Sequence, residues 1–136
     1  MRIFFIFLFL FFSDYSFATE NEAVSKNSKI SLLSEKNRVQ KGDEFIIGLK
    51  FELNPGWHTY WINPGDSGLP MEINWTLPEG LEIKNIMWPS PEIAALDPLI
   101  SYGYYDELIL PILIKANDSY KEEGRFSARL NFLVCK

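Results

Sequence analysis

A chain of 136 residues with 47% hydrophobic and 15% aromatic side chains is too apolar to stay disordered, and it is long enough for one domain with a real core. Its formal net charge of -5 at pH 7 argues against a nucleic-acid partner, which would require a basic surface. The single cysteine, Cys135, excludes an internal disulfide.

The N-terminus has the layout of a secretory signal peptide. Met1-Arg2 is a positive start, and the apolar run at 3–12 is shorter than the roughly 20 residues that a membrane-spanning helix needs. Ser16 and Ala18 place small residues at the -3 and -1 positions of a cleavage site. We therefore expect a signal peptide at 1–18 and a protein that works outside the cytoplasmic membrane. A retained membrane anchor is the alternative, and the polar residues 19–28 are predicted to form a mobile arm.

The rest of the chain is a series of short segments separated by turn residues. The clearest is 44–53, where apolar residues alternate from Phe45 to Leu53, as in a half-buried antiparallel strand. Further strands are predicted at 29–34, 71–77, 81–88, 108–115 and from Arg125 onward. Pro111 is tolerated in a strand only at an edge or bulge. Residues 92–100, which contain Pro98, are predicted to be an ordered loop.

No segment after the signal peptide has a convincing helical period, and turn signals recur every 8 to 12 residues. This pattern predicts an all-β fold, an immunoglobulin-like antiparallel β-sandwich.

An aromatic stretch at 55–70 has turn-forming residues on both sides. Pro55-Gly56 and Pro64-Gly65 are suited to type II turns. The residues between them include Trp57, His58, Tyr60 and Trp61. They form either a strand whose aromatics fill the core, or an aromatic surface or lid around a site. Two roles are open for His58: it serves a metal or acid–base function, or it is a hydrogen-bonded structural histidine.

Cys135 follows the last predicted strand. If the alternating apolar residues from Phe126 to Val134 face the core, Cys135 falls on the opposite face with Arg125 and Arg129. Basic neighbours favour the thiolate, which is the reactive form of cysteine. The alternative is an incidental, half-exposed cysteine near a frayed end. Because this strand runs to Lys136 without a closing turn, we expect a fragment or one module of a longer protein.

No motif for a metal or cofactor is present. One histidine and one cysteine cannot make a structural zinc site, and the acidic residues lack calcium-loop spacing. The sequence also has no Gly-rich phosphate loop. We therefore expect neither a cofactor nor a metal.

Several motifs occur in a characteristic order. They are GWHTYWINPGDSGLP at 56–70, W-x-L-P-x-G at 75–80, WPSPE at 88–92, YGY at 102–104, the strand LILPILI, and a last strand ending in Val134-Cys135. Over about residues 29–136, this order resembles the N-terminal periplasmic domain of the thiol:disulfide interchange protein DsbD family, in particular its copper-tolerance-type relatives.

The resemblance implies an immunoglobulin-like periplasmic domain with a redox-active pair of cysteines. In the family, the pair takes electrons from a membrane-embedded domain and reduces periplasmic disulfides by thiol–disulfide exchange.

Cys135 matches the first cysteine, which makes it the candidate catalytic residue, with His58 and Tyr60 as candidate surroundings of the redox site. The second cysteine would follow a few residues later, so the domain at 29–136 is expected to be C-terminally incomplete. Whether this chain alone is an enzyme, a protein-disulfide reductase, stays open. A cap loop shields the pair in family members, and 92–100 corresponds to it in position without matching a cap motif.

Two functions follow. The first is a periplasmic thiol–disulfide exchange module whose partners are a transmembrane electron-donor domain, of the same or a neighbouring chain, and oxidised periplasmic proteins. The alternative is a non-enzymatic secreted β-sandwich that binds sugar or peptide through exposed aromatics. Those aromatics would be Trp57, Tyr60, Trp61, Trp75 and Trp88.

Overall fold

A computed structural model describes residues 21–96 and 98–136, and the signal peptide predicted at 1–18 lies outside this part of the chain. Within the described residues the secondary structure consists of strands and turns, without a helix. The strands are β1 (Glu22–Val24), β2 (Ser28–Ser34), β3 (Glu44–Leu53), β4 (His58–Gly65), β5 (Glu72–Thr76), β6 (Leu81–Ile86), β7 (Glu92–Leu96), β8 (Leu99–Tyr105), β9 (Glu107–Ala116), β10 (Ser127–Asn131) and β11 (Val134–Cys135). No helix in this part is long and apolar enough to cross a membrane.

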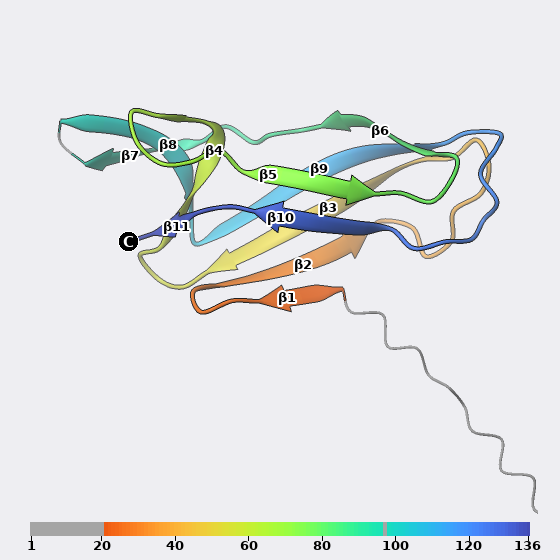
Figure 1. The fold of residues 1–136 in the computed structure, drawn as a ribbon, viewed down its shortest axis with the longest axis horizontal. Coiled ribbons are helices and arrows are strands. Elements are labelled where there is room, and N and C mark those ends of the chain that lie inside the picture. The colour runs from red at the N-terminus through yellow and green to blue at the C-terminus, as the bar shows by residue number, and fades with distance from the viewer. Residues whose placement is uncertain (1–20, 97) are drawn as a thin grey trace, which may run out of the picture.

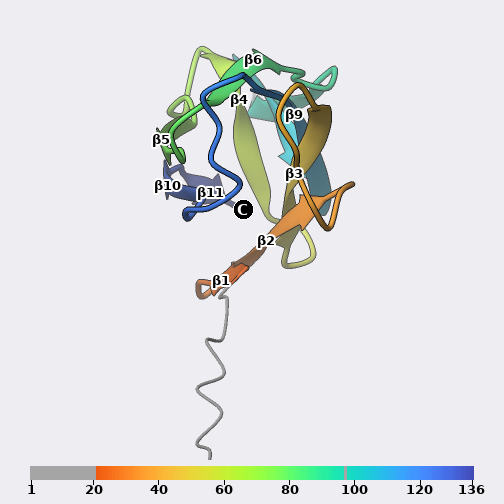
Figure 2. The same cartoon turned by 90° about the vertical axis from the view of Figure 1, so that its right-hand side faces the viewer.

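The strands form an immunoglobulin-like antiparallel β-sandwich, as the sequence predicts. One layer is the five-stranded sheet β1-β2-β3-β9-β6. The other layer is divided into the pair β10-β5 and the four-stranded sheet β11-β4-β8-β7. Figure 2 shows β3 and β9 on one side of the sandwich, with β5 and β10 on the other. Because β4 and β11 continue the second layer towards one end of the molecule, that end holds the C-terminus (Figure 1).

The core lies between the layers and is built mainly by β3 and β9. Alternate residues of both strands are buried, because successive side chains of a strand point to opposite faces. The most deeply buried large side chains are Phe51, Leu110, Ile112, Ile114 and Thr59. The Phe51 ring meets Phe132 of the other layer edge-on, with centroids 5.4 Å apart. The predicted strand at 44–53 and its buried face are therefore confirmed.

Pro111 lies in β9, between β3 and β6. Its carbonyl accepts a hydrogen bond of 2.9 Å from the Met87 amide, one residue beyond the end of β6 at Ile86. The proline nitrogen points to the same side of the strand as its carbonyl, so the missing donor falls where β6 has stopped. On its β6 side, Pro111 therefore lies at a local edge of the sheet, and an edge is one of the two places where a proline is tolerated in a strand.

Two predictions for the ends of the sheets are wrong. Residues 92–100 are not a loop, because β7 and β8 form an antiparallel hairpin with Leu96 paired to Leu99. Pro98 occupies the turn of this hairpin, where its missing donor breaks no ladder bond. The predicted mobile arm at 19–28 contains β1, which pairs with β2 through Glu22–Ser31 and Val24–Lys29. A turn in which the Ser25 amide bonds the Ser28 carbonyl at 2.8 Å holds it there.

The last predicted strand is divided between two sheets. β10 pairs with β5, and its exposed Ser127, Arg129 and Asn131 follow the predicted alternation. The chain then leaves this pair and enters the other sheet as β11, which pairs with β4. The break at 132–133 means that the alternation of β10 cannot be extended to Cys135.

The two isoleucines of β9 give a matched test of this core. Ile112 is 0% exposed and Ile109 is 44% exposed, although both lie on the same strand. We expect Ile112→Ala to lower the free energy of unfolding by roughly 2–5 kcal/mol, because it removes buried methyl groups and leaves a cavity. Ile109→Ala should cost less than about 1 kcal/mol. Urea unfolding of both variants checks this, and equal losses would contradict the assignment of the core face.

Candidate redox site at the β4–β11 pair

Cys135 lies opposite His58 in the short ladder between β11 and β4. Val134 pairs with Thr59 and Cys135 with His58. On its other side β4 pairs with β8, which places Tyr105 opposite His58 and Gly103 opposite Tyr60. Because paired residues of adjacent strands share a sheet face, the side chains of Cys135, His58, Tyr60 and Tyr105 all belong to one face. The half-buried thiol is therefore surrounded by the candidate residues that the sequence named.

His58 is 7% exposed and is held between two phenol rings. Its ring centroid lies 5.1 Å from that of Tyr60 and 5.2 Å from that of Tyr105. Burial lowers the pKa of His58 below its ordinary value, because the apolar surroundings disfavour the imidazolium ion. At neutral pH the residue beside Cys135 is thus an uncharged imidazole.

Tyr60 is 4% exposed and is a diagonal neighbour of Cys135 across the β4–β11 ladder. Burial raises the pKa of Tyr60 to about 12, and hydrogen bonding and charge interaction with Cys135 act in the same direction. A diagonal neighbour in an antiparallel pair is within reach of a long aromatic side chain. Since the phenol keeps its proton at physiological pH, it is available as a donor to the sulfur.

The segment that carries Cys135 is fastened from the opposite face. Thr59 is fully buried, and its hydroxyl donates a hydrogen bond of 3.0 Å to the Leu133 carbonyl. The chain end lies against the turn between β3 and β4, where a Cβ at Gly56 would be 3.6 Å from the Lys136 side chain. That turn is closed by the Trp57 amide, which donates to the Asn54 carbonyl at 2.9 Å. These contacts fix the position of a strand only two residues long.

The predicted surroundings of Cys135 need one correction. The alternation of β10, extended to the chain end, assigns it basic neighbours on the face of Arg125 and Arg129. Arg129 pairs with Asn74 of β5, in a different sheet from Cys135. The groups that face the thiol are instead imidazole and phenol rings. The signal for this in the sequence is the pair His58 and Tyr60, spaced two apart on one strand.

The aromatics of 55–70 and of the other motifs mostly pack inward. Trp61, Trp75 and Trp88 are partly buried against the core, and the Trp75 ring lies 5.4 Å from that of Phe126. The Trp61 indole N–H is buried and has no hydrogen-bond partner among the described residues. With Tyr60 buried as well, these rings do not form the open stacking surface that a sugar-binding sandwich would need.

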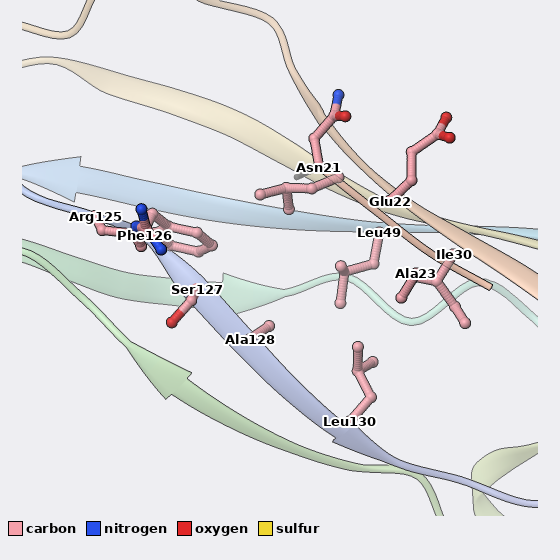
Figure 3. A pocket seen from close by; sticks show the side chains of 11 residues that line it. Asn21, Glu22, Ala23, Ile30, Leu49, Arg125, Phe126, Ser127, Ala128 and Leu130 are labelled. Carbon is pink, nitrogen blue, oxygen red and sulfur yellow. The ribbon is translucent and has the colours of Figure 1, made fainter. Parts of the chain in front are cut away.

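The described part of the chain contains no group of three or more His, Cys, Asp or Glu residues that could hold a metal ion. A groove of about 400 Å³ lies away from the thiol, between the first layer and β10 (Figure 3). Its lining residues come from β1, β2, β3, β10 and the residues next to them, and include Ile30, Leu49, Phe126 and Leu130. Cys135 is not among them, so this groove is separate from the sheet face that holds the thiol.

Comparison with known proteins shows the family of the chain. The model of the family described as "Thiol:disulfide interchange protein DsbD, N-terminal" matches residues 30–136. The chain belongs to the DsbD N-terminal domain family. A crystal structure of the N-terminal periplasmic domain of ScsB from Proteus mirabilis is similar, with a TM-score of 0.61 and 28% sequence identity. The match covers 82% of this chain and 41% of that chain. A comparison with curated proteins found no match.

As a DsbD N-terminal domain, the chain is a thiol:disulfide interchange family domain, and the sequence resemblance is confirmed. The single cysteine of this sequence lies in the edge strand β11, and both β11 and its partner β4 fall within the residues that the family model matches.

His58 provides a pH test of the site, because it is the one histidine in the sequence. Its lowered pKa means that the folded state disfavours the proton that the unfolded chain accepts below about pH 6.5. We expect the free energy of unfolding to fall as the pH is lowered from 7.5 to 5.5, by no more than about 1.4 kcal/mol per pH unit. His58→Gln should remove this part of the pH dependence while leaving the contribution of the carboxylates. Identical pH profiles of the two proteins in urea unfolding would show that His58 is not desolvated.

Proposed function

We propose that this domain carries out thiol–disulfide exchange through Cys135 in the periplasm. The observation that carries the proposal is the placement of the only thiol of the chain on one sheet face with His58 and Tyr60. The family match and the periplasmic relative support it. The half-burial of Cys135 is consistent with a sulfur that a partner's disulfide can reach.

The exchange begins with the Cys135 thiolate attacking one sulfur of a partner's disulfide. A new S–S bond forms to Cys135 as the partner's S–S bond breaks, and the released partner sulfur leaves as a thiolate that takes up a proton. A second thiol, supplied from beyond this single-cysteine sequence, then attacks Cys135 and releases the partner with both of its sulfurs reduced. The two electrons come from that pair of thiols, which becomes the disulfide.

Tyr60 supports the first step as a hydrogen-bond donor. A proton donor beside a sulfur stabilises the thiolate, and hydrogen bonds to charged groups are stronger than those between neutral groups. The Tyr60 pKa of about 12 keeps its proton in place at the working pH. The uncharged His58 packs beside the same ring and limits the space in which the phenol can move.

The direction of electron flow is a further part of the proposal, and it is suggested by the resemblance to the family. We propose that a transmembrane electron-donor domain, of the same or a neighbouring chain, reduces the cysteine pair, which in turn reduces oxidised periplasmic proteins. The signal-peptide layout at 1–18 and the periplasmic location of the ScsB domain favour this compartment. Binding of sugar or peptide through aromatics is not favoured, because Trp61, Trp75 and Trp88 pack against the core and Tyr60 is buried.

Replacing the thiol tests the function directly. In a protein extended to the second cysteine of its relatives, Cys135→Ser should abolish reduction of a periplasmic disulfide protein, because no mixed disulfide can form. Trapping free thiols with an alkylating reagent and resolving the products on gels measures this. Urea unfolding provides the control, since serine at this half-buried position should change stability by less than about 1 kcal/mol. Unchanged reduction by a folded variant would exclude Cys135 as the exchanging residue.

Two buried tyrosines with the same raised pKa test the donor role. Tyr60→Phe should move the pH midpoint of Cys135 alkylation by iodoacetamide about one unit higher, because the thiolate loses a donor. Tyr104→Phe is the matched control: its pKa is also raised to about 12 by burial, but its hydroxyl donates to the Pro89 carbonyl at 2.8 Å. Equal midpoints in the two variants would remove Tyr60 from the mechanism.

A further inference from the structure

The loop at 66–68 folds back over the ring of Tyr60. Gly68 lies so close to this ring that a Cβ built on Gly68 would be 2.3 Å from two of the ring carbons and 2.6 Å from a third. Gly68 also has a φ of +97°, a left-handed conformation that residues with a side chain rarely adopt. Glycine is thus required here for two independent reasons, and one of them is the Tyr60 ring itself.

A set of polar contacts ties this loop to β8. The Asp66 amide donates to the Ile100 carbonyl at 2.8 Å, and the Ile100 amide donates to the Asp66 carboxylate at 2.9 Å. The hydroxyls of Ser67 and Ser101 are 2.6 Å apart, and the Ser101 hydroxyl also lies 3.2 Å from the Ser67 carbonyl, to which it donates. Ser101 is 2% exposed, so its bonds to Ser67 are partly shielded from water, whereas those between Asp66 and Ile100 are exposed. We call residues 66–68, with these contacts, the strap.

The strap lies on the same side of the sheet as the thiol. Ser101 and Gly103 alternate along β8, and Gly103 pairs with Tyr60. The buried Ser101 therefore shares its face with Tyr60, and β11 brings Cys135 to that face through His58. The titratable groups on this face are His58 and Tyr60 from β4, Tyr105 from β8, Glu92 from β7, which pairs with Gly103, and Cys135 itself. A displacement of the Tyr60 ring would change the surroundings of the sulfur.

We propose that the strap is a positioning device for the exchange reaction, in which Gly68 clamps the Tyr60 ring so that its hydroxyl stays directed at Cys135. The proposal rests on the proposed function of Cys135 and adds residues that the exchange chemistry alone does not identify. Gly68 and Ser101 act through Tyr60 and are positioning residues, because neither is assigned a contact with the sulfur. Because Gly68 has no side chain, the loop can contact the Tyr60 ring, and the hydrogen bonds to β8 hold the loop in place.

The test is the pH dependence of Cys135 alkylation in the 136-residue chain, whose single cysteine makes the signal unambiguous. Gly68→Ala forces the ring or the loop to move, so we expect the pH midpoint of iodoacetamide labelling to rise by several tenths of a unit to about one unit, as in Tyr60→Phe. Gly42→Ala is the matched control, because Gly42 has a similar φ of +83° but nothing within 4 Å of its built Cβ. It carries the backbone strain alone and should leave the midpoint unchanged.

A double variant separates positioning from general damage. If Gly68 acts through the Tyr60 hydroxyl, Gly68→Ala should produce no further shift in a Tyr60→Phe background. An equal shift in both backgrounds, or an equal shift from Gly42→Ala, would overturn the proposal.

Ser101→Ala provides a second route to the same result if Gly68→Ala fails to fold. It removes the hydroxyl contacts of the strap without adding a clash, and a smaller rise of the midpoint is expected. Wild-type midpoints in both Gly68→Ala and Ser101→Ala would refute the strap while leaving the exchange function intact, provided that Tyr60→Phe still shifts the curve. A wild-type midpoint in Tyr60→Phe would refute the donor role, and with it the strap.

Discussion

The site depends on the pairing of β11 with β4. Two residue pairs, Val134–Thr59 and Cys135–His58, bring the end of the chain onto a strand that the first layer does not contain. The buried hydroxyl of Thr59 fixes this register by bonding the Leu133 carbonyl. A shift of one residue would turn Cys135 to the opposite face, away from Tyr60. The face on which the thiol lies is therefore set by the backbone register of β11 against β4.

Much of the fold can be predicted, because period-2 alternation is a local signal. The strand 44–53 has the bounds and the buried face that its sequence predicts, since its apolar residues repeat at every second position. The β7–β8 hairpin escapes prediction because Pro98 suggests a strand breaker, whereas it occupies the turn between two strands. Cys135 stays a prediction as the reacting residue, and the structure places it beside His58 and Tyr60 instead of on the face of Arg129. No periodicity shows that a chain changes sheets at 132–133, and only the three-dimensional pairing shows that His58 and Cys135 meet.

The aromatic stretch at 55–70 contributes both to the core and to the surroundings of the thiol, which are the two roles that the sequence leaves open. Trp61 packs against the core, while His58 and Tyr60, on the other face of the same strand, border the thiol. Alternation along β4 lets one segment stabilise the sandwich and shape the site. The glycine and serine residues that follow then carry the chain back over the Tyr60 ring. This explains why so many turn-forming and aromatic residues are concentrated within 55–70.

The brevity of β11 has a consequence for access to the sulfur. Local opening of a protein costs less free energy where few ladder bonds and few buried apolar contacts must be broken. A strand of two residues, held by one short ladder to β4, can detach while β3 and β9 stay intact. Protection of Cys135 is then governed by local opening of the β11–β4 ladder and not by the global stability of the sandwich. Hydrogen-exchange rates at the β11 amides would thus be much faster than those in the core.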